Sequence, residues 1–206
     1  AVPIVLLLNF LVGAVVAFLG ATVLRDFGAT IYTVDLVAYA FMRELGVLLA
    51  AILLAGRTAS AFTAQIGSMK INEELDALQV QGFSTMELLV LPRMLALVIV
   101  LPLLTFLAIL AGMLGGAVVS LLTLDISLAR YIAIVQEIPI RHILLGLSKS
   151  PIFAVLIALI GCLEGLKVAG SAQSVWEHTT SAVVQSIFAV ILLDAVAALF
   201  FMQMGW

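Results

Sequence analysis

Long apolar runs separated by short polar stretches dominate the sequence. Five of these runs have about 20 residues or more, which is enough for a helix to cross the ~30 Å hydrocarbon core of a bilayer. None alternates apolar and polar residues as a barrel strand does. The pattern therefore predicts five membrane-spanning helices, with approximate bounds Val2–Leu24, Asp35–Ala55, Leu95–Leu122, Ile143–Leu163 and Ala182–Met204.

The composition agrees with a membrane protein. Of the 206 residues, 65% are hydrophobic and 10% are charged, whereas soluble domains have about 45–50% and about 25%. This excludes a water-soluble enzyme and a disordered chain, and the net charge of -3 provides no basic surface for nucleic acid. We expect an all-α integral membrane protein with a single transmembrane domain over residues 1–206.

The connections between the spans predict an orientation. Arg and Lys are slightly more numerous in the second and fourth connections, which the positive-inside rule places in the cytoplasm. Five spans put the termini on opposite sides, so we expect a cytoplasmic N-terminus and a periplasmic C-terminus. The third connection contains an amphipathic stretch around residues 128–135.

Four charged residues fall inside the apolar spans: Arg43, Glu44, Lys149 and Asp194. A charge at the centre of a membrane helix costs about 2.5–3.5 kcal/mol on insertion scales, so such residues are paired or face a cavity. Counting 1.5 Å per residue places all four at one level. They form either a neutralising ion-pair network or the polar lining of a cavity that admits a lipid headgroup. Charged residues inside membranes favour the functional interpretation.

Small residues also recur in the third span. Gly112 and Gly116, followed by Ser120, form a stripe that allows close helix approach, within one subunit or between two. His142 and His178 are far apart and lack Cys or carboxylate neighbours at ligand spacing, so we expect interfacial residues and no metal site.

After the second span, small residues followed by Gly67 predict a helix that leaves the membrane and turns there. A short helix is predicted at about residues 70–82, between the second and third spans. Asn72 is the expected N-cap, and acidic residues in the first turn suit the helix dipole. Interfacial helices favour Lys and Arg on the polar face, so an acidic helix fits better in a groove of a partner protein. The residues expected to make this contact are Glu73, Glu74, Leu75, Asp76 and Leu78.

Catalytic sequence motifs are missing. The chain contains no Gly-x-Ser-x-Gly, His-Glu-x-x-His or Cys-x-x-Cys. The stretch Gly146–Ser150 resembles the end of a phosphate-binding loop, but that loop needs glycines where Ile143 and Ser148 stand. We therefore expect a non-catalytic chain that draws any energy of ATP hydrolysis from another subunit.

Four linked sequence blocks stand out: Arg43-Glu44-Leu45-Gly46, Ala55-Gly56-Arg57, Ala64-Gln65-Ile66-Gly67-Ser68-Met69 and Glu74-Leu75-Asp76-Ala77-Leu78. They resemble the MlaE/YrbE permease family, and the resemblance covers essentially the whole chain. Relatives often have Pro after the first block, where this chain has Val47. The family also has an amphipathic interfacial helix before its first span, and we expect that helix to precede Ala1 in a longer chain.

The resemblance implies a complete transport system. Members of this family are membrane subunits of bacterial ABC transporters that work with MCE proteins on phospholipids and other lipids. The expected assembly is an inner-membrane homodimer with two cytoplasmic ATPases that bind ATP and Mg, an MCE-protein ring on the periplasmic side and a possible STAS-domain regulator. By resemblance, the segment around Glu74 is the coupling helix, the dimer encloses a lipid cavity, and the system serves outer-membrane lipid asymmetry.

Two other classes of function remain open. An ion- or proton-coupled secondary transporter or channel would use the same intramembrane charges as a relay, although five unrepeated spans lack the inverted repeats common in such proteins. An assembly scaffold would only gather partners. Stimulation of the ATPase by lipid would favour the lipid transporter. Dependence of transport on an ion gradient would favour the secondary transporter or channel.

Overall fold

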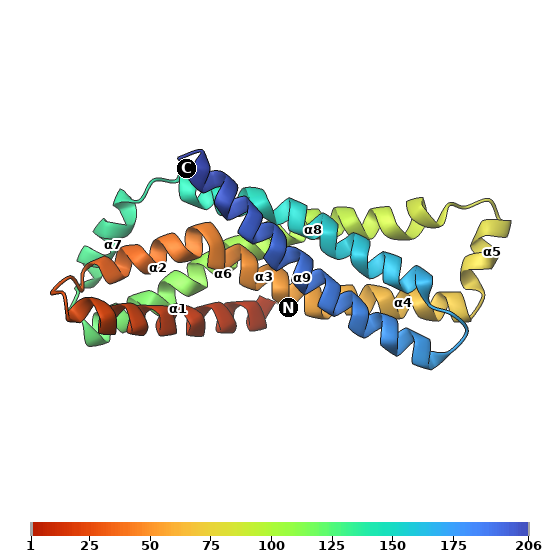
Figure 1. The fold of residues 1–206 in the computed structure, drawn as a ribbon, viewed down its shortest axis with the longest axis horizontal. Helices are drawn as coiled ribbons and strands as arrows, with labels where there is room; N and C mark the ends of the chain where they lie inside the picture. Colours follow the sequence, from red (N-terminus) through yellow and green to blue (C-terminus); the bar gives the residue numbers. More distant parts are fainter. Residues whose placement is uncertain (1, 206) are drawn as a thin grey trace. The chain divides into compact units, whose positions relative to one another are not determined.

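The computed structural model describes residues 2–205 and confirms an all-α membrane protein (Figure 1). Within these residues the chain forms helices and no strand, and five helical segments are long and apolar enough to cross a membrane. The helices are α1 Val2–Arg25, α2 Tyr32–Ala40, α3 Gly46–Leu54, α4 Ser60–Ile71, α5 Glu74–Val80, α6 Leu91–Thr123, α7 Leu128–Glu137, α8 Arg141–Lys167 and α9 Ala172–Gln203. Three π-helical turns interrupt or extend these helices. The turn η1 Phe41–Leu45 lies between α2 and α3, η2 Ala55–Ala59 lies between α3 and α4, and η3 Met86–Val90 directly precedes α6.

The helices divide into two compact units. The first unit comprises Ala1–Ala50 and Pro102–Lys149, and the second comprises Ala51–Leu101 and Ser150–Trp206. Helices α3, α6 and α8 each contribute residues to both units.

Close packing of α6 on α1 organises the first unit. A Cβ atom added at Gly13 would lie 2.0 Å from the carbonyl oxygen of Gly112, and one added at Gly115 would lie 2.0 Å from the carbonyl oxygen of Phe10. The two backbones therefore touch, and no side chain larger than hydrogen fits between them. Such small-residue contacts are a principal source of helix association in membranes, where lipid removes the hydrophobic driving force.

The predicted glycine stripe on the third span also packs inside the chain. A Cβ atom at Gly112 would lie 2.1 Å from the ring of Phe41, and one at Gly116 would lie 2.6 Å from Val37. Both neighbours belong to the α2–η1 segment. Both glycines therefore pack closely against another segment of the same chain.

Helix α7 is amphipathic, as the pattern around residues 128–135 predicts, and packs its apolar face on the first unit. Tyr131 is buried with Val34 and Ala117, and its hydroxyl donates to the carbonyl oxygen of Met113 at 2.8 Å. Burial raises the pKa of Tyr131 to about 12, because the phenolate loses its hydration.

Close contact between α4 and α8 organises the second unit. A Cβ atom at Gly161 would lie 3.0 Å from the Cα atom of Ala59, the last residue of η2, and one at Gly165 would lie 3.1 Å from the carbonyl oxygen of Thr63 in α4. The buried Thr63 hydroxyl donates to the carbonyl oxygen of Gly161 at 2.8 Å. Helices α4 and α8 therefore pack backbone against backbone.

The second span is longer than predicted. We expect Asp35–Ala55 from the apolar pattern, followed by a turn at Gly67, but the helical segment continues over Tyr32–Ile71. A Cβ atom at Gly67 would lie 2.8 Å from the Val168 side chain. Gly67 therefore serves helix packing, and the turn prediction is wrong.

The third and fifth spans begin earlier than predicted. The third helical segment starts at Met86, not near Leu95, and runs through Pro102. The fifth starts at Ala172, where Ser171 caps the helix by accepting a hydrogen bond from a backbone N–H. Polar residues mark the edge of the apolar run, but they do not stop the backbone from continuing as a helix.

Two glycine substitutions test the backbone contact between α1 and α6. Gly13→Ala is expected to destabilise the protein by about 1–3 kcal/mol, because the new methyl group meets a backbone carbonyl that cannot rotate away. Gly56→Ala is the matched control: its Cβ meets nothing within 4 Å, and alanine favours a helix by about 1 kcal/mol. Thermal unfolding of both purified variants in detergent measures the difference. Equal unfolding temperatures would contradict the contact.

Candidate functional site

The π-helical turn η1 carries two of the four predicted intramembrane charges, Arg43 and Glu44. A π turn inserts one extra residue into a helix and occurs frequently at functional sites. Phe41 and Met42 in the same turn are buried. The side chains of Arg43 and Glu44 are 25% and 30% exposed, respectively, so the turn presents its charges at a partly open surface.

Lys149 of α8 completes a cluster of three charges in the first unit. Its side chain is only 4% exposed and forms an ion pair with Glu44 Oε2. Its ammonium group also donates to the carbonyl oxygen of Arg43 at 3.3 Å. The other carboxylate oxygen, Glu44 Oε1, lies 4.0 Å from Arg43 Nε. Glu44 therefore lies between two cations, one buried and one accessible.

Gly146 brings Lys149 within reach of Glu44. A Cβ atom at this position would lie 2.1 Å from the carbonyl oxygen of Met42, so α8 approaches the backbone of η1 directly. From the sequence, Gly146 was not predicted to take part in this cluster. A glycine three positions before an intramembrane lysine is the signal that points to it.

Asp194 lies in the second unit, on α9, and is buried. The buried residues of this helix recur at every fourth position, which defines one packed stripe: Ala182, Ser186, Val190 and Asp194. The structure brings Arg43, Glu44 and Lys149 together as expected. The common level of Asp194 with them stays a prediction.

The two cations of the cluster have different chemical possibilities. The guanidinium of Arg43 is partly exposed, and its planar donors match the oxygens of a phosphate. Lys149 is enclosed and its ammonium is engaged within the chain. Among residues 2–205 there is no group of three or more His, Cys, Asp or Glu side chains that could hold a metal ion. His142 is buried edge-on against the Tyr39 ring, with ring centroids 4.8 Å apart.

The short helix predicted between the second and third spans is present as α5, but its start differs from the prediction. The N-cap position is Glu73, whose φ of 59° is left-handed, and its side chain caps no backbone N–H. Asn72 instead contacts the Glu74 carboxylate at 3.4 Å. The prediction of an Asn72 cap is wrong, because the left-handed residue turns the chain one position later.

Leu75 was expected to face a partner protein, but it faces its own chain. It is buried with Ile66, Val90 and Cys162 in the core of the second unit. Leu75 therefore attaches α5 to its own chain. Leu78 is half-buried, and the acidic residues Glu73, Glu74 and Asp76 are exposed.

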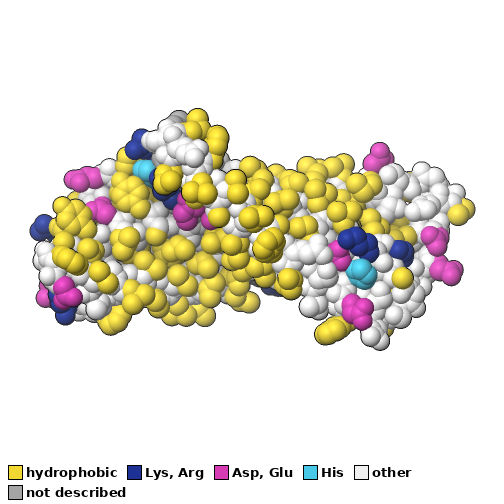
Figure 2. Space-filling view, viewed as in Figure 1, with side chains coloured by type: hydrophobic (Ala, Val, Ile, Leu, Met, Phe, Trp, Pro, Cys, Tyr) yellow, Lys and Arg dark blue, Asp and Glu magenta, His cyan; other side chains and the backbone are white. Residues whose placement is uncertain are grey.

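The exposed apolar residues follow Leu75 along the chain. Val80 is 89% exposed at the end of α5, and Phe83 in the next turn is 52% exposed. Lys, Arg, Asp, Glu and His side chains gather at the end of the second unit that carries α5 and the α8–α9 connection, as Figure 2 shows. This end combines an acidic surface with two prominent apolar side chains.

A second polar cluster, which the sequence analysis did not identify, joins α8 to α9. Glu164 is only 3% exposed, and its carboxylate is 2.6 Å from Lys167 Nζ and 2.7 Å from His178 Nδ1. Gln185 donates to the same carboxylate at 3.3 Å. The spacing of Glu164 and Lys167 by three positions was the available sequence signal.

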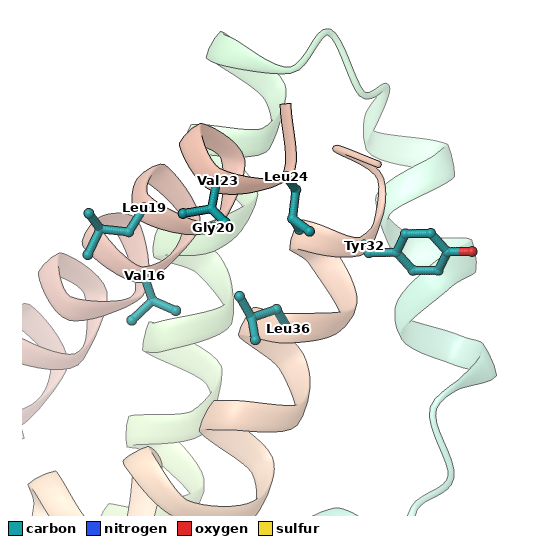
Figure 3. A pocket seen from close by; sticks show the side chains of 7 residues that line it. All are labelled: Val16, Leu19, Gly20, Val23, Leu24, Tyr32 and Leu36. Atoms are coloured by element: carbon teal, nitrogen blue, oxygen red, sulfur yellow. The ribbon is translucent and has the colours of Figure 1, made fainter. Parts of the chain in front are cut away.

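An apolar groove lies between α1 and α2 in the first unit. It has a volume of about 600 Å³, and Figure 3 shows the Tyr32 ring directed away from the other side chains that line it. A Cβ atom at Gly20 would lie 3.0 Å from the Leu36 side chain, so this glycine opens the groove. Its lining consists of Val16, Leu19, Gly20, Val23, Leu24, Tyr32 and Leu36.

Comparison with protein families connects this architecture to known proteins. The family model described as permease MlaE matches residues 1–200. A probable ABC transporter permease protein of Synechocystis, slr1045, is 39% identical over 167 residues, which cover 81% of this chain and 64% of that protein. A probable ABC transporter permease protein of Rickettsia bellii is 31% identical over 203 residues, which cover 98% of this chain and 78% of that protein.

A plant protein is similar as well. The chloroplastic protein TRIGALACTOSYLDIACYLGLYCEROL 1 of Arabidopsis thaliana is 36% identical over 171 residues, which cover 81% of this chain and 48% of that protein. The matched region therefore spans between about half and three quarters of the length of these three relatives.

Different exposure of Arg43 and Lys149 predicts different effects on stability. Lys149→Met removes the buried ammonium and leaves the Glu44 carboxylate, whose side chain is 30% exposed, without its ion-pair partner; we expect a loss of up to about 3 kcal/mol, because the carboxylate stays partly hydrated. Arg43→Met removes a partly exposed contact at 4.0 Å, for which we expect less than about 1 kcal/mol. Unfolding of the purified variants in detergent measures both. Equal losses, or a larger loss for Arg43→Met, would contradict the assignment of buried and accessible cations.

Proposed function

From the premise that the chain belongs to the MlaE family of ABC transporter permeases, we propose that it moves phospholipid or a related lipid between the bacterial inner membrane and an MCE-domain protein. The observation that carries the lipid assignment is the partly exposed guanidinium of Arg43 beside the ion pair of Glu44 with the buried Lys149. The Arabidopsis relative, whose name contains a diacylglycerol lipid, supports the same class of substrate.

Arg43 is the proposed contact for the lipid phosphate. A guanidinium can donate two parallel hydrogen bonds to phosphate oxygens, and its charge is permanent. The surrounding helices are apolar and suit acyl chains. This arrangement binds an anionic group at the level of a membrane span, where an amphiphile needs a polar contact.

Glu44 and Lys149 are the proposed support of this contact. Glu44 is close enough to Arg43 to orient its guanidinium and to reduce the positive charge of an empty site. The ion pair with Lys149 fixes Glu44 in turn. The structure thus favours a division of roles, with Arg43 for the lipid and Lys149 for the architecture of the cluster.

Energy is proposed to come from a partner ATPase that contacts α5. Val80 and Phe83 are exposed apolar residues at and just after the end of α5, and exposed carboxylates lie at its start. This chemistry fits an apolar groove with a basic rim. Leu75, which is buried, anchors α5 on the permease side of the contact.

The remaining parts of the assembly follow from family membership. We propose an inner-membrane homodimer with the N-terminus in the cytoplasm and the C-terminus in the periplasm. An MCE-domain protein takes up or delivers lipid on the periplasmic side, and a STAS-domain protein regulates the ATPase.

Substitution of Arg43 tests the lipid assignment. Arg43→Ala is expected to assemble normally but to lower crosslinking of a photoreactive phospholipid about tenfold, because a charge-assisted hydrogen bond contributes about 1.5–3 kcal/mol. Arg130→Ala is the control, since Arg130 is an exposed arginine on α7. Mass spectrometry of the crosslinked protein measures lipid occupancy. Unchanged crosslinking by Arg43→Ala, or an equal loss in the control, would refute the phosphate contact.

Substitution at the end of α5 tests the ATPase contact. Val80→Asp is expected to lower copurification of the ATPase about tenfold or more while the permease stays folded, because the side chain is exposed. Leu75→Ala is expected to destabilise the permease itself by about 2–5 kcal/mol, since Leu75 is buried. Normal ATPase recovery with Val80→Asp would contradict this docking surface.

A further inference from the structure

A polar pocket lies in the first unit, where α1 and α6 both end. Its volume is about 360 Å³. Helix ends that follow membrane-spanning segments lie at the headgroup level of the bilayer, so the pocket faces lipid headgroups. It is lined by Phe18, Ala21, Thr22, Arg25, Asp26 and Thr123.

Two opposite charges line this pocket side by side. Arg25 is the last residue of α1, and Asp26 follows it in the turn. Over residues 2–205, neither side chain forms an ion pair within 4.0 Å or a hydrogen bond. The guanidinium and the carboxylate are therefore both available to a ligand.

Two hydroxyl groups add acceptors. The Thr22 hydroxyl donates to the carbonyl oxygen of Phe18 at 2.8 Å, and the Thr123 hydroxyl donates to the carbonyl oxygen of Val119 at 2.6 Å. A hydroxyl has one hydrogen, so each donation leaves its oxygen as an acceptor only. The pocket thus offers one cationic donor group and three acceptor groups.

We propose that this pocket binds the headgroup of a phospholipid that carries a primary ammonium, as phosphoethanolamine does. Arg25 donates to the phosphate, and Asp26, Thr22 and Thr123 accept hydrogen bonds from the ammonium. A quaternary choline has no N–H to donate, and a glycerol headgroup has no cation for Asp26. The pocket therefore selects the phosphoethanolamine headgroup over both.

The occupant is a lipid of the surrounding leaflet, not free phosphoethanolamine. Phe18 forms part of the lining and is itself exposed, and the exposed apolar face of α1 continues from it through Val15 and Leu11. This face gives acyl chains an apolar contact directly below the headgroup. The α1–α2 groove in Figure 3 has no charged lining residue and offers no comparable selection.

Competition among lipids tests the proposal. The purified protein is incubated with equal amounts of phosphatidylethanolamine, phosphatidylcholine and phosphatidylglycerol, and native mass spectrometry measures the lipids retained. We expect retention of phosphatidylethanolamine to exceed that of each other lipid about fivefold or more, and Asp26→Asn to abolish this preference. Arg25→Gln should lower retention of phosphatidylethanolamine, and Thr123→Val should weaken the preference.

Controls separate this pocket from other lipid sites. Asp125→Asn changes an exposed carboxylate at the same end of α6 that does not line the pocket, and it should leave the preference unchanged. The preference should also persist in Arg43→Ala, so it does not depend on the proposed transport site.

Three outcomes would overturn the proposal: equal retention of the three lipids, an Asp26→Asn variant that keeps the preference, or loss of the preference in Asp125→Asn. Displacement of the retained lipid by soluble phosphoethanolamine at equal concentration would refute the claim that the occupant is a membrane lipid, because acyl contacts should make the lipid bind more tightly. A copurified protein helix that covers the pocket and excludes all three lipids would also refute it.

Discussion

The burial of a lysine ammonium inside apolar helices constrains the whole first unit. Lys149 needs an anion within ion-pair distance, because an unpaired charge at this depth is too costly. Glu44 supplies that anion, but only because Gly146 lets α8 touch the backbone of η1. The turn η1 also packs against α6, where the Phe41 ring fills the space left by Gly112. The ion pair therefore depends on glycine contacts that fix η1 between α6 and α8.

The sequence predicted the class of fold and the number of spans, because apolar runs of membrane length have few alternative structures. It did not predict where the helices end. Gly67 looked like a turn because glycine weakens helices, yet its contact with Val168 requires a residue without a side chain. A pattern of single positions does not contain the packing partner, which lies about a hundred positions further along the chain.

The candidate site was predictable in part for a similar reason. Intramembrane charges stand out in any sequence, so Arg43, Glu44 and Lys149 could be selected by their cost alone. The different exposure of these side chains could not be predicted, because it depends on how each helix is rotated about its axis. In α5, Leu75 and Leu78 looked equivalent at a spacing of three. Only the tertiary contact of Leu75 with Cys162 distinguishes the internal side chain from the external one.

The second unit is built so that a displacement of α5 cannot be absorbed locally. Leu75 fixes α5 against α4 and α8 through Ile66 and Cys162. Helices α4 and α8 are in close contact at Gly165, where a Cβ atom would lie 3.1 Å from the carbonyl oxygen of Thr63. At the end of α8, the buried Glu164 carboxylate binds His178 of α9 at 2.7 Å, and its separation would leave a buried charge with fewer partners. Because the joints are buried side-chain packing at Leu75, a close backbone contact at Gly165 and a buried ion pair at Glu164, we expect α5, α4, α8 and the start of α9 to move together.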